Sequence, residues 1–128
     1  QSWLPLLLIT LPRFYGGLLH NLCSSAQHTG YPMNVYDHRC NTRTVIMNPV
    51  LRFFYWNMNY HIEHHLYPSV PFHALKKLHS EIKMQLPNPQ KSLIEAWNEM
   101  IRCLVIQMKT PSHFIIPVLT EKPKLRHG

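Results

Sequence analysis

Three histidines stand close together near the middle of the chain, at positions 61, 64 and 65. Residues three and four apart lie on one face of a helix, so a helix here would aim His61, His64 and His65 at one point. Imidazole is a good ligand for iron, copper, zinc and nickel. The spacing therefore predicts a metal site. A polar helix face with incidental histidines is the alternative.

The same spacing argues against two kinds of zinc site. The H-E-x-x-H helix of metalloproteases needs a glutamate directly after its first histidine, and Ile62 occupies that place. Glu63 lies two residues after His61 and is predicted to point away from the histidine face. Structural zinc sites favour cysteines at short spacing, whereas the three cysteines of this chain lie far apart. We therefore expect a site built from histidines without thiolates.

A second polar stripe comes earlier in the chain. His20, Ser24 and His28 are spaced four apart and share one face of a predicted helix, which Gly30 and Pro32 would end. A polar stripe is costly in apolar sequence at membrane depth and therefore indicates function. We interpret His28 as a further candidate metal ligand and His20 as a helix-end histidine near the membrane surface.

The composition differs from that of an ordinary soluble domain. Charged residues make up only 15% of the 128 residues, against roughly 25% in average globular chains. The apolar run 3–11 has no charged region before it and does not resemble a signal peptide. Neither it nor the run 14–23 reaches the roughly 20 apolar residues of a spanning helix. We expect a truncated or kinked membrane segment in the C-terminal piece of a longer protein; a buried core helix of a soluble protein is the alternative.

The chain is basic, with a formal net charge of +7 that is concentrated in its second half. A basic segment that follows membrane-embedded sequence indicates a cytoplasmic face. Nucleic acid is not an expected partner, because the lysines are scattered and form no compact stripe. The separated cysteines favour a reducing compartment.

The predicted fold class is all-α: the C-terminal part of a multi-pass membrane helical protein with a cytoplasmic helical cap. Three segments follow from the sequence: a truncated membrane-embedded helical segment at 1–30, the cap with the histidine triplet at 31–109, and a loosely ordered tail at 110–128. Within the cap we expect a polar connection at 31–47, pinned by its own charged side chains. One helix should run from Asn48-Pro49 through the triplet to Pro68, a second from Phe72 to about Leu86, and a third near 90–109.

Parts of the chain resemble the membrane fatty acid desaturase family, over roughly residues 1–100. The matching stretches are Asp37–Thr44, Trp56–His65, Tyr67–Pro68 and Pro71–Leu75. His61-x-x-His64-His65 resembles the third histidine box of that family, and Ser24–His28 resembles its lone-histidine motif. Related desaturases have an asparagine four residues before the lone histidine, where this chain has Ser24.

The resemblance implies a di-iron centre, with His28, His61, His64 and His65 as iron ligands. It implies O2-dependent introduction of a double bond into an acyl chain carried as an acyl lipid, acyl-CoA or acyl-ACP. The electron donor would be a cytochrome b5 or ferredoxin type of protein. The location would be the endoplasmic reticulum or a bacterial inner membrane, with the C-terminus cytoplasmic. No substrate-binding residue is assigned.

The two earlier histidine boxes of the family do not occur in residues 1–128, so we expect this piece alone to be inactive. Three alternatives remain open: a related membrane lipid hydroxylase, a non-catalytic membrane metal-binding or docking module, and a soluble histidine-rich binding protein.

Overall fold

The computed structural model describes residues 2–119, and within them the chain is all-α, as predicted. The α-helices are α1 (Leu11–His28), α2 (Pro49–Phe54), α3 (His61–Leu66), α4 (Leu75–Ile82) and α5 (Leu93–Gln107). A π-helical turn (Leu6–Thr10) precedes α1, and 3-10 turns (Phe72–Ala74 and Lys83–Gln85) flank α4. The described range contains no strand; Val45 and Gln90 form an isolated parallel bridge.

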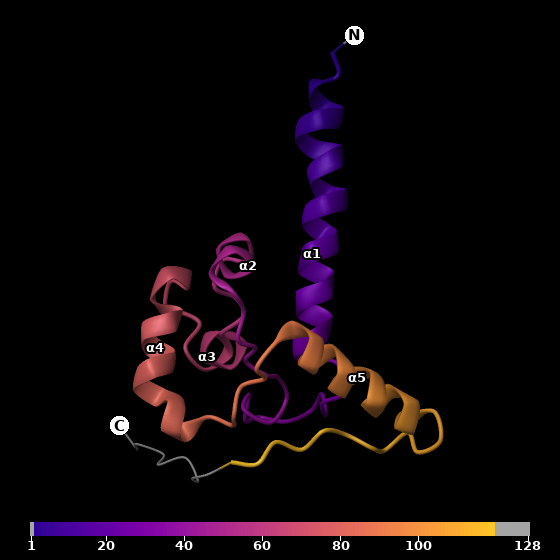
Figure 1. Ribbon diagram of the computed structural model, residues 1–128, viewed down its shortest axis with the longest axis vertical. Helices are drawn as coiled ribbons and strands as arrows, with labels where there is room; N and C mark the ends of the chain where they lie inside the picture. The colour runs from indigo at the N-terminus through magenta and orange to yellow at the C-terminus, as the bar shows by residue number, and fades with distance from the viewer. Residues whose placement is uncertain (1, 120–128) are drawn as a thin grey trace.

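The first helix rises away from the other elements, which gather around its C-terminal end (Figure 1). Pro12 has no backbone N–H and so cannot bond to the carbonyl of Leu8. The wider π-helical turn precedes this proline, and the N–H of Leu11 donates to the carbonyl of Leu6 five residues back. The helical path is therefore continuous through Pro12.

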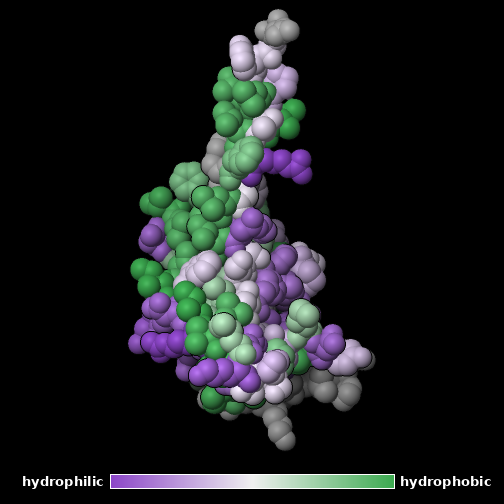
Figure 2. All heavy atoms as spheres, turned by 90° about the vertical axis from the view of Figure 1, so that its right-hand side faces the viewer, coloured by the Kyte–Doolittle hydropathy of each residue, from purple (hydrophilic) through white to green (hydrophobic). Residues whose placement is uncertain are grey.

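Large apolar side chains are exposed along the projecting part of the molecule, where green predominates in Figure 2. They include Trp3, Leu7, Leu8, Ile9 and Phe14. Within residues 2–119, none of the helices combines the length and the apolar character needed to cross a membrane.

The prediction of a single helix from Asn48 to Pro68 was wrong. Asn48 does begin a helix, and its side chain accepts a hydrogen bond from the N–H of Leu51 at 2.8 Å. That helix, α2, ends at Phe54, and α3 begins only at His61. Trp56 and Asn57 between them have φ values of 54° and 53°, a left-handed conformation that a right-handed helix cannot contain.

Hydrogen bonds to other segments stabilise the non-helical conformation between α2 and α3. The side chain of Asn59 donates to the carbonyl of Val45 at 2.8 Å, and the side chain of Gln27 donates to the carbonyl of Met58 at 2.9 Å. The same carbonyl would accept an intrahelical bond if the helix continued. Long-range contacts therefore override the helical pattern of the local sequence.

The core lies where α1, the 31–47 connection, the end of α2 and α5 meet. It is formed by Cys23, Ala26, Val45, Met47, Tyr55 and Ala96. The helix predicted near 90–109 is present as α5, and the side chain of Ser92 caps it by accepting from the N–H of Glu95. The buried face of α5 is Ala96, Met100 and Cys103. Large apolar side chains elsewhere on this helix are exposed: Ile94, Ile101, Leu104, Val105 and Ile106.

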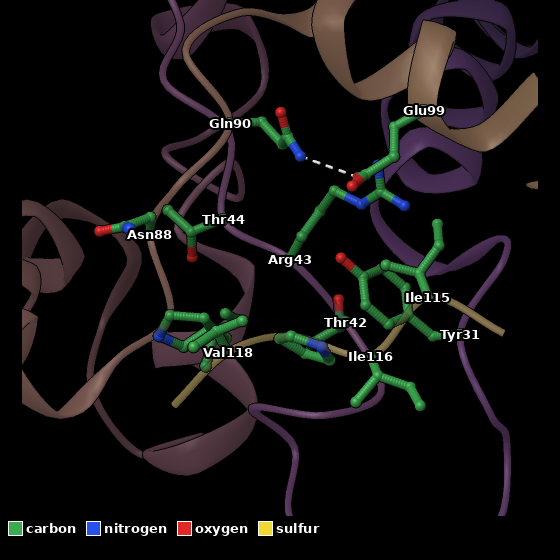
Figure 3. Close-up of a pocket in the computed structure, with 13 residues that line it drawn as sticks. Tyr31, Thr42, Arg43, Thr44, Asn88, Gln90, Glu99, Ile115, Ile116 and Val118 are labelled. Carbon is green, nitrogen blue, oxygen red and sulfur yellow. Dashed lines mark hydrogen bonds and ion pairs between the residues drawn. The ribbon is translucent and has the colours of Figure 1, made fainter. Parts of the chain in front are cut away.

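The 31–47 connection is pinned by its charged side chains, as predicted. Arg39 pairs with Asp37 at 2.6 Å and donates to the carbonyl of Gln85. Arg43 pairs with Glu99 at 2.7 Å, in the polar pocket of Figure 3. Both guanidinium groups are almost completely buried. Arg39 therefore joins the connection to the 3-10 turn after α4, and Arg43 joins it to α5.

Gly30 ends the first helical segment, as predicted. Its φ is 93°, a conformation that residues other than glycine rarely adopt, and a Cβ atom there would lie 2.8 Å from Cδ1 of Ile115. The carbonyl of Gly30 accepts from the N–H of Ile115 at 2.8 Å. The tail predicted at 110–128 thus contacts the end of α1 in its described part; residues 120–128 lie outside the described residues.

Candidate metal centre

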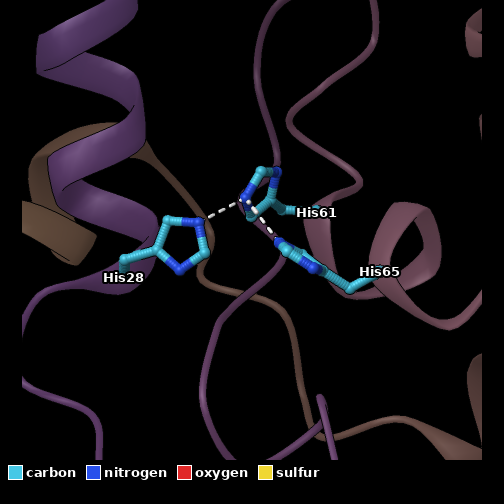
Figure 4. A group of neighbouring side chains, drawn as sticks. All are labelled: His28, His61 and His65. Atoms are coloured by element: carbon cyan, nitrogen blue, oxygen red, sulfur yellow. Dashed lines mark hydrogen bonds between the residues drawn. The ribbon is translucent and has the colours of Figure 1, made fainter. Parts of the chain in front are cut away.

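Three of the predicted ligands meet at one point, although they come from segments more than thirty residues apart. His28 is the last residue of α1, and His61 and His65 lie on α3. The Nε2 atom of His61 lies 2.6 Å from Nε2 of His28 and 3.2 Å from Nε2 of His65 (Figure 4). The ligand atoms of the three side chains all lie within 4.8 Å of one another.

Gln27, the residue before His28, connects α1 to the segment that leads into α3. Its side chain is fully buried, donates to the carbonyl of Met58 and accepts from the hydroxyl of Tyr55 at 2.9 Å. Its backbone carbonyl accepts from the hydroxyl of Thr42 at 3.0 Å. These bonds fix the end of α1 against the residues before His61, which brings the two histidine-bearing helices together.

The cluster favours uncharged imidazoles. Burial, assisted by the neighbouring imidazoles of His28, His65 and His64, lowers the pKa of His61 to about 3. Partial burial also lowers the pKa of His65 and, although its side chain is largely exposed, that of His28. A metal binds the neutral form of histidine, so these side chains have lone pairs available at neutral pH.

The donor set fits a transition metal. A neutral imidazole nitrogen carries either one hydrogen or one lone pair, so Nε2 of His61 cannot bond equally well to both of its neighbours. A cation placed among the three nitrogens would accept all three lone pairs. Imidazole ligands suit iron, zinc, copper and nickel. The His28, His61 and His65 cluster is therefore consistent with metal binding.

His64 lies beside this group. Its ring centroid is 6.1 Å from that of His61 and 5.8 Å from that of His65. Its Nδ1 atom is buried without a hydrogen-bond partner. The role of His64 as a ligand stays a prediction. His20 lies outside the cluster, with its ring 6.3 Å from that of Tyr55.

Sequence reasoning missed two polar neighbours of the cluster. His38 and Asn41 line a cavity of about 330 Å³ together with His28 and His65. The ring of His38 lies 5.0 Å from that of His65, and its Nδ1 atom lies 3.4 Å from Oδ1 of Asn41. Both residues belong to an irregular connection, where no periodic pattern indicates the direction of a side chain.

An all-α scaffold that brings three imidazoles together defines a helical protein with a candidate histidine-based metal site. The model of the family Fatty acid desaturase matches residues 1–97, which include all four candidate ligands. The chain belongs to the fatty acid desaturase family, as its histidine motifs predict. No curated protein and no solved structure gives a significant match.

Membership of this family suggests an oxidoreductase and implies an acyl substrate. Family members are typically membrane-bound. The match therefore agrees with the class of reaction that the histidine motifs predict.

Proposed function

We propose that this chain supplies part of the di-iron centre of a membrane fatty acid desaturase, which introduces a double bond into a lipid acyl chain in an O2-dependent reaction. The observation that carries the proposal is the convergence of His28, His61 and His65 within the region that matches the family.

Each histidine has a role in this proposal. His28, His61 and His65 bind one iron ion, and His64 contributes to the second. The buried Nδ1 atom of His64 supports this role, because a buried polar atom without a partner is costly. When bound, the iron supplies the activation of dioxygen and the removal of hydrogen from an unactivated C–H bond. Four histidines are too few for two iron sites, so the proposal requires further ligands beyond residues 1–128.

An apolar groove supports a lipid substrate. It lies between α1 and the end of α2 and has a volume of about 410 Å³. Its lining is mostly apolar and consists of Gly16, Leu19, His20, Phe54, Tyr55, Trp56 and Met58. The exposed apolar side chains of the projecting part support a membrane location. A hydrocarbon chain is the kind of ligand that such a surface binds.

The basic side of the cap supports an acidic electron donor of the cytochrome b5 or ferredoxin type. Lys76, Lys77 and Lys83 are exposed on and directly after α4. Complementary charge speeds the encounter of two proteins and orients them. In this proposal α4 faces the cytoplasm, where such a donor is found.

The test is product analysis in membranes that contain the intact protein, an electron donor and an acyl substrate. We expect an O2-dependent double bond, and loss of that product in His61→Ala. His113→Ala is the matched control, because His113 is exposed and lies outside both the cluster and the groove. A hydroxylated product would replace the desaturase proposal with the hydroxylase alternative. An iron-loaded protein without any product would favour a non-catalytic metal-binding module.

A further inference from the structure

The helix that carries two of the three clustered histidines is short. α3 contains six residues, and its N-cap residue Tyr60 makes no side-chain capping bond. Isolated helices of this length are unstable in water, so contacts with neighbouring segments must hold α3 in place. The rotation of α3 about its own axis decides where His61 and His65 point.

Glu63 makes two such contacts. Its side chain is fully buried. The hydroxyl of Thr44 donates to Oε2 of Glu63 at 2.5 Å, and Nδ1 of His79 contacts Oε1. A carboxylate only accepts hydrogen bonds, so the imidazole of His79 donates.

These contacts join three parts of the fold. Thr44 belongs to the 31–47 connection, Glu63 to α3 and His79 to α4. The ring of His79 also packs against that of Tyr60, with centroids 5.2 Å apart. The carboxylate is therefore held from two sides, and its position relative to the rest of the cap is fixed.

The anchored face and the histidine face lie on opposite sides of α3. Successive residues of an α-helix are about 100° apart around the axis. Glu63 is therefore roughly 200° from His61, whereas His65 is only about 40° from His61. As the sequence predicts, Glu63 points away from the histidine face. Any rotation of α3 that moves His61 and His65 away from His28 would also pull Glu63 from its partners.

We propose that Thr44, Glu63 and His79 form a positioning cluster, which fixes the rotation of α3 and so aims His61 and His65 at the metal. The inference rests on the proposed metal-binding function. Glu63 is a positioning residue and not a ligand, because it lies on the face of α3 opposite the histidines, where its carboxylate contacts Thr44 and His79. Partners that orient metal ligands in this way typically change metal affinity by roughly 10- to 100-fold when removed.

The test is titration of the intact, metal-free protein with Co²⁺, a spectroscopic probe for an iron site. In Glu63→Gln we expect roughly 10- to 100-fold weaker binding and a changed Co²⁺ absorption spectrum, since the ligands no longer hold the same geometry. Thr44→Val removes one donor and keeps the side-chain shape, so it retains the fold if Glu63→Gln does not. For Thr44→Val we expect a smaller loss of Co²⁺ affinity than for Glu63→Gln, and a change of the absorption spectrum in the same direction.

Glu99→Gln is the matched control. It weakens the ion pair with Arg43, which lies outside the positioning cluster. We expect the Co²⁺ affinity and spectrum of this variant to equal those of the unaltered protein. If folded Thr44→Val and Glu63→Gln also bind Co²⁺ with unaltered affinity and spectrum, the positioning role is wrong while the metal site stands. If the unaltered protein binds neither Co²⁺ nor Fe²⁺, the proposed function is wrong, and the positioning role falls with it.

Discussion

Two groups of polar side chains lie close together in this molecule, and Tyr31 lines the cavities beside both. In the first group, shown in Figure 3, Arg43 pairs with Glu99 and donates to the carbonyls of Ala96 and Thr29. The second group is the histidine cluster of Figure 4. One group contains opposite charges, and the other contains three copies of the same side chain.

The two groups differ in how many of their polar atoms have a favourable partner within the group. Both terminal nitrogens of Arg43 have partners, its guanidinium lies 4.7 Å from the centre of the Tyr31 ring, and only its Nε atom lacks a hydrogen bond. In the histidine cluster, the pKa of His61 is lowered to about 3. Burial makes the largest contribution, and the neighbouring imidazoles further disfavour a positive charge on His61. The Arg43 group, whose charges are paired, stabilises the fold. The histidine cluster, whose lone pairs converge, favours a bound cation.

Removal of the guanidinium in Arg43→Met should give the largest change in stability. It removes the donor to the carbonyls of Ala96 and Thr29 and the ion-pair partner of Glu99. We expect the free energy of unfolding to fall by roughly 3 kcal/mol, the lower end of the range for breaking a buried pair, because Glu99 is partly exposed. Denaturant titration measures this loss. Co²⁺ affinity of the folded fraction should stay unchanged; a weaker metal site would show that the two groups are coupled.

His28→Ala should weaken metal binding strongly and change stability little. The side chain is exposed, so its loss should change the free energy of unfolding of the metal-free protein by at most about 0.5 kcal/mol. Because a ligand is removed, we expect at least roughly 100-fold weaker metal binding, the upper end of what loss of a ligand's partner causes. Titration of the intact protein with Co²⁺ measures it. Equal affinity in the variant would exclude His28 from the site.

A smaller effect is expected in the segment that leads from α2 to α3. Asn57 has a left-handed conformation, which asparagine tolerates better than alanine does. Asn57→Ala should lower the free energy of unfolding by about 1 kcal/mol, and Asn57→Gly should not. A denaturant titration of both variants checks this difference. If alanine is as stable as glycine at position 57, the left-handed turn is not what separates the two helices.

The smallest expected effect is the loss of stability at low pH that comes from the pair of Asp37 and Arg39. The hydrogen bond and charge of Arg39 hold the pKa of Asp37 below its usual value. The pair therefore contributes stability above the pKa of the unfolded carboxyl, about 3.8, and this contribution is lost as the pH falls through the lower folded pKa. Since Asp37 is about one-third exposed, we expect less than about 1 kcal/mol. Denaturation of Asp37→Asn across this pH range should show a smaller acid-dependent loss than the unaltered protein.

Much of the site was predictable because its residues follow simple rules. The spacing of His61, His64 and His65 predicts a shared helical face, and α3 contains all three. The all-α class and the helix start at Asn48 also follow from local patterns. The polar stripe of the first helix and the resemblance to desaturases both indicated His28 as a ligand. Whether it joins the group depends on where α1 ends relative to α3, which neither of them gives.

What the sequence did not predict depends on contacts between distant segments. No glycine or proline marks the break at Trp56 and Asn57, which Gln27 and Asn59 maintain through bonds to other elements. In the same way, no sequence pattern indicates that His79 pairs with Glu63 sixteen residues earlier. Neither pairing leaves a periodic signal in the sequence.

The most direct test of the central claim is the iron content of the intact protein, purified in detergent, beside a variant with His61, His64 and His65 all changed to alanine. We expect two iron ions per molecule of the unaltered protein, held in part by ligands other than these three histidines and His28, and a clear loss in the variant. A folded protein without iron, or a variant that keeps all of it, would contradict the claim that these histidines bind metal.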